Sequence, residues 1–148
     1  MIEVGEVSTP QRPVAATIAV VIRQGRVLLV RRRNPPDAGR WGFPGGKIEF
    51  GETVLAAAER ELFEETAVRA KAQQVFTAVD ALDFDGERAV RAHFILVAVL
   101  CRWVSGQPVA GDDALEADWF DLKTLDEANL AMSFGVADVA RQAASLIA

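Results

Sequence analysis

Hydrophobic and polar positions change their period several times along the chain, and the first apolar stretch belongs to a hairpin. Residues 14–22 are β-branched and almost wholly apolar, which predicts a strand covered on both faces. Gln24-Gly25 marks a tight turn, and residues 26–32 return as a second strand. Residues 34–39 are rich in Pro, Asp and Gly and predict a loop. We therefore expect the N-terminal half to begin with a β-hairpin.

The second half of the chain contains the longer strands. Residues 70–82 and 90–104 predict two strands joined by an Asp-Gly turn at residues 83–87. Residues 105–113 are polar and contain two glycines, which predicts a loop. Residues 116–122 predict a short final strand.

Two stretches have the spacing of amphipathic helices. The first is a run without Gly or Pro that ends near Thr66, and Thr53 stands where an N-cap is expected. The second, residues 133–147, closes the chain, and residues 125–129 form a short helical turn before it. The apolar stripe of the first helix is Leu55, Ala58 and Leu62, and that of the last is Phe134, Val136, Val139, Ala140, Ala143 and Leu146.

This order of elements predicts an α+β fold with a mixed β-sheet and helices on its faces, because strands and helices do not alternate strictly. Residues 1–13 contain two prolines and no clear period, so we expect an N-terminal arm, either an edge strand or a dimer contact. Residues 14–148 are expected to form one domain, since 148 residues suffice for a single core. A homodimer is left open.

Charge and composition narrow the classes of function. The net charge is −5 and the pI is near 4.9, which disfavours a nucleic-acid partner because binding to phosphates needs a clustered basic face. The apolar runs are shorter than the roughly 20 residues that cross a bilayer, and residues 1–13 lack a signal peptide. Cys101 is the single cysteine, which excludes an internal disulfide. We expect a soluble, cytoplasmic protein with no membrane partner.

The first helix concentrates acid on one side. Glu61, Glu64 and Glu65 lie at i, i+3 and i+4, so their carboxylates project from one face. Like charges repel, and a hard divalent cation such as Mg²⁺ would neutralise them. A solvated helix surface is the alternative for these three residues taken alone.

The stretch around this helix resembles the Nudix box, in which glycine, glutamate, arginine and paired glutamates stand at fixed gaps. Five residues separate Gly46 from Glu52, and seven separate Glu52 from Arg60. One position departs, because the family's closing glycine is Ala67 in this chain. The positions that carry the resemblance are Gly46, Glu52, Arg60, Glu61, Leu62, Glu64, Glu65 and Val68.

The resemblance implies a Nudix-like α/β/α sandwich and a metal-dependent hydrolase with Mg²⁺, or Mn²⁺ as a substitute. It implies Glu64 and Glu65 as principal metal ligands, Glu61 as a further ligand or general base, and Glu64 as a catalytic group as well. It implies the carbonyl of Gly45 as a backbone ligand and Arg60 as the residue that holds a catalytic glutamate. Glu52 is implied as an additional metal carboxylate or a residue behind the ligands.

One residue of the box and three outside it are candidates for binding the substrate. Gly46, Trp41, Arg32 and Glu116 form this set, although Trp41 fits a core position equally well and Arg32 belongs to a basic run that also suits a solvated strand end. Glu116 competes with Asp112 and Asp113 for the role of a later acidic residue that completes the site in some relatives.

The implied reaction is cleavage of a pyrophosphate bond in a nucleoside diphosphate linked to another moiety. A small-molecule nucleotide is therefore the expected partner. ADP-ribose or another nucleotide sugar is favoured, and pyrophosphohydrolysis of a (d)NTP is the alternative. A third hypothesis is a nucleotide-sensing module without hydrolysis. Such proteins typically lose the glutamates of the box, which this chain retains.

Overall fold

The computed structural model describes residues 11–35, 37–127, 130–133 and 135–147. Most of the N-terminal arm predicted at residues 1–13 lies outside these ranges, as does Phe134 of the predicted helical stripe. The division into an arm and one domain therefore stays a prediction.

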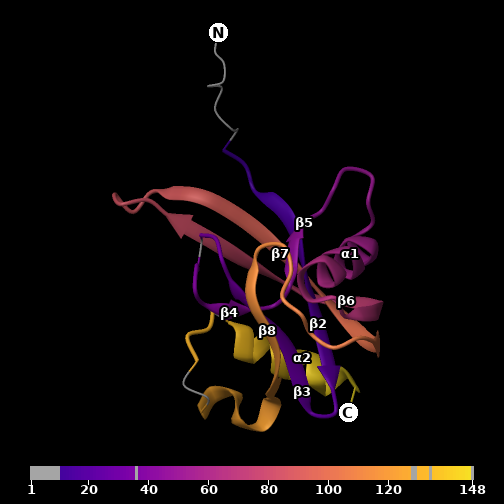
Figure 1. Cartoon of the computed structure of the whole chain (residues 1–148). Helices are drawn as coiled ribbons and strands as arrows, with labels where there is room; N and C mark the ends of the chain where they lie inside the picture. The colour runs from indigo at the N-terminus through magenta and orange to yellow at the C-terminus, as the bar shows by residue number, and fades with distance from the viewer. Residues whose placement is uncertain (1–10, 36, 128–129, 134, 148) are drawn as a thin grey trace.

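Within the described residues, a mixed sheet of seven strands forms the centre of the molecule (Figure 1). Its main path runs β4-β3-β2-β7-β6, with β5 paired to β2 and β8 paired to β3. The central strands β2 and β7 run parallel, and the other pairs are antiparallel. The strands are β2 (Val14–Arg23), β3 (Arg26–Arg32), β4 (Trp41–Gly42), β5 (Gly45–Lys47), β6 (Arg69–Phe84), β7 (Val90–Ser105) and β8 (Ala114–Asp121).

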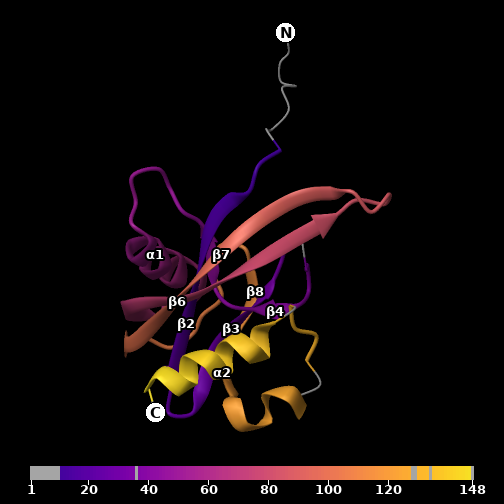
Figure 2. The same ribbon diagram turned by 180° about the vertical axis from the view of Figure 1, so that it is seen from behind.

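The predicted hairpins are confirmed. β2 and β3 pair antiparallel around Gln24 and Gly25, whose φ angles of 54° and 76° are those of a two-residue turn with both central residues left-handed. β6 and β7 are longer than predicted, and their distal halves project beyond the body of the sheet in both views (Figures 1 and 2). The short strands β4 and β5 were not predicted, since two or three residues are too few to show a strand period.

Two helices cover opposite faces of the sheet, α1 (Val54–Thr66) and α2 (Val136–Ile147) (Figure 2). Neighbouring residues of β2 point into different cores. Val20 packs in the cluster that contains the buried face of α2, and Val21 packs in the cluster with Leu62 of α1. Both faces of β2 are therefore buried, as predicted, and the molecule has the expected α/β/α layers. A 3₁₀ helix, η1 (Leu122–Glu127), stands where the sequence predicted a helical turn at residues 125–129.

The ends of the helices show where the periodicity was misleading. Thr53 caps α1 as predicted, and its Oγ1 accepts a hydrogen bond from the Ala56 N–H at 3.1 Å. Leu55, however, is 36% exposed, and Leu146 in α2 is 46% exposed. In the first turn of α1 the residue before Leu55, Val54, is half-buried and packs against the core instead. In α2 the fully buried residues end at Ala143, so the last turn of this helix extends beyond the core.

Candidate active site

Two glycines in β5 bring the main chain against the acidic helix. Gly45 pairs with Ile18 and Gly46 pairs with Thr17 across the β2–β5 ladder. A Cβ atom on Gly45 would lie 2.1 Å from the Thr17 carbonyl oxygen, and one on Gly46 would lie 2.5 Å from an oxygen of the Glu61 carboxylate. Any side chain at Gly46 would therefore displace Glu61, which explains the glycine by contact rather than by flexibility.

Arg60 joins three glutamates of the predicted set. Its Nε and Nη2 atoms donate to both oxygens of Glu52, at 2.7 and 3.0 Å. Its Nη1 atom donates to Glu61 at 3.0 Å and to Glu64 at 3.2 Å. The hydrogen bond from Arg60 lowers the pKa of Glu52, and Glu52 in turn raises the pKa of Arg60. The guanidinium therefore fixes the carboxylates by a planar, two-pronged contact that lysine cannot make.

Glu61 and Glu65 form the least solvated part of the acidic face. Burial, followed by the neighbouring charge of Glu61, raises the pKa of Glu65 to about 8, against a weaker opposing hydrogen bond from the N–H of Gly45. Burial also raises the pKa of Glu61, and the contact with Arg60 opposes this shift. Two adjacent carboxylates removed from water must either share a proton or gain a cation.

The donors of this site suit a hard cation. Glu61, Glu64 and Glu65 offer carboxylate oxygens, which Mg²⁺ and Mn²⁺ prefer to nitrogen or sulfur. Within the described ranges, no three His, Cys, Asp or Glu side chains already stand together as a ligand set. Glu61 and Glu64 instead each form an ion pair with Arg60, at 3.0 and 3.2 Å. The oxygen donors therefore fit the expected metal in chemistry, and Arg60 now contacts two of the three carboxylates that would hold it.

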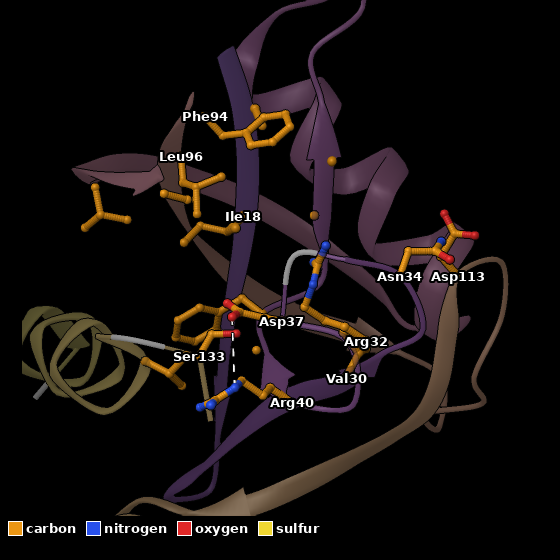
Figure 3. A pocket seen from close by; sticks show the side chains of 18 of the residues that line it. Ile18, Val30, Arg32, Asn34, Asp37, Arg40, Phe94, Leu96, Asp113 and Ser133 are labelled. Carbon is orange, nitrogen blue, oxygen red and sulfur yellow. Dashed lines mark ion pairs between the residues drawn. The ribbon is translucent and has the colours of Figure 1, made fainter. Parts of the chain in front are cut away.

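A cleft of about 1230 Å³ opens over Glu61 and Glu65. Figure 3 shows Phe94, Leu96 and Ile18 on one side of it and Arg32, Asn34 and Asp113 on another. Asp37 and Arg40 face each other at 4.0 Å near Ser133. The distal part of β6 contributes a further wall that includes Asp80, Asp83 and Phe84. The cleft thus combines the carboxylates of Glu61 and Glu65 with further acidic, apolar, basic and hydroxyl groups, and it is large enough for a nucleotide.

The structure brings most of the predicted site residues to this place. Gly45, Gly46, Glu61, Glu65 and Arg32 line the cleft. Glu52 and Glu64 are joined to it through Arg60.

Trp41 and Glu116 lie apart from the acidic face. The Trp41 ring packs edge-on against Phe120, with 4.8 Å between centroids, and belongs to the core on the α2 side. Glu116 on β8 pairs with Arg31 at 2.9 Å. Neither residue lines the cleft described above, whereas Arg32, the neighbour of Arg31, does.

Four further aromatic or titratable residues lie outside the acidic face, namely Phe43, Phe50, His93 and Cys101. Phe43 is buried beneath the cleft, and Phe50 is fully exposed in the loop before α1. His93 contacts Asp80 at 2.9 Å across the β6–β7 hairpin. Cys101 is buried, and burial raises the pKa of its thiol to about 12, so it is an inert core residue.

Some cleft residues had no signal in the sequence. Ser133 and Gly135 stand just before α2, and Phe94 and Leu96 lie on β7, far along the chain from the acidic helix. The apolar pattern assigned β7 to the core without showing that one face of it would line a cleft. Phe94 and Leu96 reach the cleft because β2 and β7 pair in parallel, which places Val14 opposite Phe94 and Ala16 opposite Leu96.

Comparison with known proteins decides the family. The model of the NUDIX domain matches residues 11–140. The chain belongs to the Nudix family. This Nudix chain is 35% identical over 113 residues to an ADP-ribose pyrophosphatase of Methanocaldococcus jannaschii. The matched segment covers 76% of this chain and 64% of the relative. The chain is 32% identical over 106 residues to an oxidized purine nucleoside triphosphate hydrolase of Danio rerio, covering 72% of the chain and 65% of the relative. The chain thus spans less than two thirds of the length of either relative.

Solved structures agree on the fold. A MutT NUDIX hydrolase from Burkholderia pseudomallei superposes with a TM-score of 0.76 at 28% identity, covering 89% of this chain and 98% of that one. A MutT protein from Methanosarcina mazei Go1 superposes with a TM-score of 0.74 at 20% identity. The helices in the described part of this Nudix chain are too short or too polar to span a bilayer.

Proposed function

We propose that this chain is a Mg²⁺-dependent Nudix hydrolase that cleaves the pyrophosphate bond of a nucleoside diphosphate linked to another moiety, with ADP-ribose or another nucleotide sugar as the favoured substrate. The observation that carries the proposal is the half-buried Glu61–Glu65 pair that lines the cleft, held against Gly45 and Gly46 and flanked by Arg60. Glutamates with no ligand to bind would be expected to stay fully solvated, whereas partial burial raises the pKa of both of these carboxyls.

Some residues of the site would bind the metal or the substrate, and others would position those residues. Glu61, Glu64 and Glu65 would hold the metal, which when bound neutralises phosphate charge and lowers the pKa of an attacking water. Arg60 orients Glu52, Glu61 and Glu64 by its three contacts. Arg32 lines the same cleft and brings a positive charge that can bind a phosphate oxygen. Phosphoryl transfer leaves the protein mainly this positioning and neutralising role.

The similarity to the M. jannaschii ADP-ribose pyrophosphatase supports a nucleotide sugar as the substrate. The similarity to the D. rerio hydrolase supports the second candidate, pyrophosphohydrolysis of a (d)NTP, including oxidized purines. The two reactions leave different products. Cleavage of ADP-ribose at the pyrophosphate releases two monophosphates, whereas a (d)NTP releases a (d)NMP and inorganic pyrophosphate.

The test is a substrate panel with Mg²⁺, comprising ADP-ribose, nucleotide sugars, diadenosine polyphosphates, canonical (d)NTPs and oxidized purine dNTPs. Products are identified by chromatography. We expect the largest kcat/KM for ADP-ribose or another nucleotide sugar, and loss of that activity in Glu65→Gln and on removal of the metal. A preference for a dNTP would support the second candidate. Binding of nucleotides without turnover of any substrate would contradict an enzymatic function and support a sensing module.

A further inference from the structure

The loop between β7 and β8 holds the C-terminal end of α1 through its main chain. The last carbonyl groups of a helix have no partner within the helix and must be satisfied from outside. Here the Val109 N–H donates to the Thr66 carbonyl oxygen at 2.8 Å, and the Gly111 N–H donates to the Glu65 carbonyl oxygen at 2.9 Å. The partners of this helix end therefore come from a segment more than forty residues later in the sequence.

Two glycines allow this close approach. A Cβ atom on Gly111 would lie 2.6 Å from the carbonyl oxygen of Glu64, and one on Gly106 would lie 2.8 Å from that of Ala67. Both contacts are with main-chain atoms, which cannot rotate aside as a flexible side chain can. A side chain at Gly111 would therefore have to move either the loop or the helix turn that carries Glu64 and Glu65.

The other end of the same loop is tied to the basic side of the cleft. The Arg33 N–H donates to the Asp113 carbonyl oxygen at 3.0 Å, and the Ala114 N–H donates to that of Gly111 at 3.0 Å. β8 then begins opposite Arg32 in the ladder with β3. Figure 3 shows Asp113 beside Asn34, on the side of the cleft that also carries Arg32. One loop thus connects the acidic helix end to the end of β3.

We propose that Gly111 is a positioning residue for the metal-binding carboxylates, with the loop at residues 106–113 setting where Glu64 and Glu65 stand relative to Arg32. This inference rests on the proposed function, because it assigns a purpose to the placement of those carboxylates. Gly111 takes no part in the chemistry, and it acts through the helix end. Displacements of about 1 Å at a reacting centre can lower rates about 100-fold.

The test compares Gly111→Ala with Gly86→Ala, a matched control in the hairpin turn where a Cβ atom would meet nothing within 4 Å. Binding of Mn²⁺ alone is measured by calorimetry, and kcat and KM are measured on the substrate that the panel selects. We expect Gly111→Ala to weaken metal binding about 10- to 100-fold and to lower kcat by a similar factor, with little change in KM. Gly86→Ala should match the wild type in all three quantities.

A purely structural role would give a different result, since a smaller folded fraction lowers kcat without changing the affinity of the folded protein for the metal. Unchanged Mn²⁺ affinity in Gly111→Ala would overturn the inference. Glu65→Gln, measured in the same way, distinguishes failure of the positioning role from failure of the proposed function. If Glu65→Gln loses metal binding while Gly111→Ala keeps it, only the positioning role fails, and if Glu65→Gln also keeps it, the proposed function fails.

A second measurement needs no variant, in case Gly111→Ala does not fold. Amide hydrogen exchange of the wild type is followed by NMR with and without Mg²⁺. We expect the amides of Val109 and Gly111 to exchange more slowly when the metal is bound, because the helix end that they contact is then fixed. Metal binding that slows exchange in α1 and leaves Val109 and Gly111 unchanged would refute the coupling.

Discussion

Ala67 occupies the position where the helix that carries the acidic face ends, and replacing it with glycine should stabilise the protein. Its φ of 62° and ψ of 7° place it in the left-handed region, and its N–H donates to the Phe63 carbonyl oxygen at 2.9 Å. This is the geometry of a helix C-cap that usually contains glycine. The Nudix box has glycine at this position, so the departure seen in the sequence falls where the backbone conformation favours glycine most.

The expected increase in the free energy of unfolding of Ala67→Gly is the difference between two opposing contributions. A left-handed conformation costs an L-residue about 1–2 kcal/mol, which glycine avoids. Glycine loses about 0.5–1 kcal/mol more than alanine through the greater freedom of the unfolded chain. Ala67 is exposed, so removal of its methyl group leaves no cavity. The free energy of unfolding should therefore rise by about 0.5–1 kcal/mol, which raises the Tm by about 2–4 °C for a chain of this size.

The assay is urea denaturation followed by circular dichroism, with Ala56→Gly as a matched control. Ala56 is an exposed residue in the first turn of α1 with an ordinary helical role, so the same chemical change should destabilise there, by up to about 1 kcal/mol. Opposite signs for the two variants would support the account. Destabilisation by Ala67→Gly equal to that of Ala56→Gly would refute the left-handed conformation of Ala67.

Three further predictions concern the ends and the face of α1. Because the pKa of Glu65 is raised from 4.5 to about 8, the folded protein keeps this proton while the unfolded chain releases it, so without metal the free energy of unfolding should fall between pH 4.5 and 8. Denaturation of wild type and Glu65→Gln across this range should show a smaller fall in the variant, and parallel curves would contradict the buried pair. Arg60→Lys loses the paired contact with Glu52 and should lower kcat about 10- to 100-fold in steady-state assays; full activity would show that this contact does not position the site. Thr53→Ala removes the N-cap and should lower the free energy of unfolding by about 1 kcal/mol with kcat unchanged, and a lowered kcat would show that the two ends of the helix are coupled.

The sequence predicted the local parts of the fold well, because each rests on a short pattern. β3 has the predicted bounds, and Thr53 caps α1 as its position indicated. The errors lie where burial depends on a distant partner. Leu55 and Leu146 have the right helical spacing, yet Leu55 is exposed while its neighbour Val54 packs on the core, and Leu146 lies beyond the buried part of α2. A period shows which side of a helix is apolar and cannot show how far the neighbouring sheet extends.

In the candidate site, too, the residues set by local spacing were predictable and those placed by distant pairing were not. Glu52, Arg60 and the acidic face were visible because they lie at fixed gaps within one loop and one helix. The wall of the cleft was not, because Phe94 comes into place only through the parallel pairing of β2 with β7. The loop contacts of Gly111 were equally hidden, since they are made by main-chain atoms that any sequence contains.

We propose that the acidic face of α1 is a metal-dependent catalytic site. Its most direct test is the kcat of Glu64→Gln for the best substrate of the panel with saturating Mg²⁺, beside wild type and Glu87→Gln, an exposed glutamate in the hairpin turn. We predict a fall of at least about 100-fold for Glu64→Gln, an unchanged circular dichroism spectrum and full activity for Glu87→Gln. Equal turnover by wild type and Glu64→Gln would contradict the account.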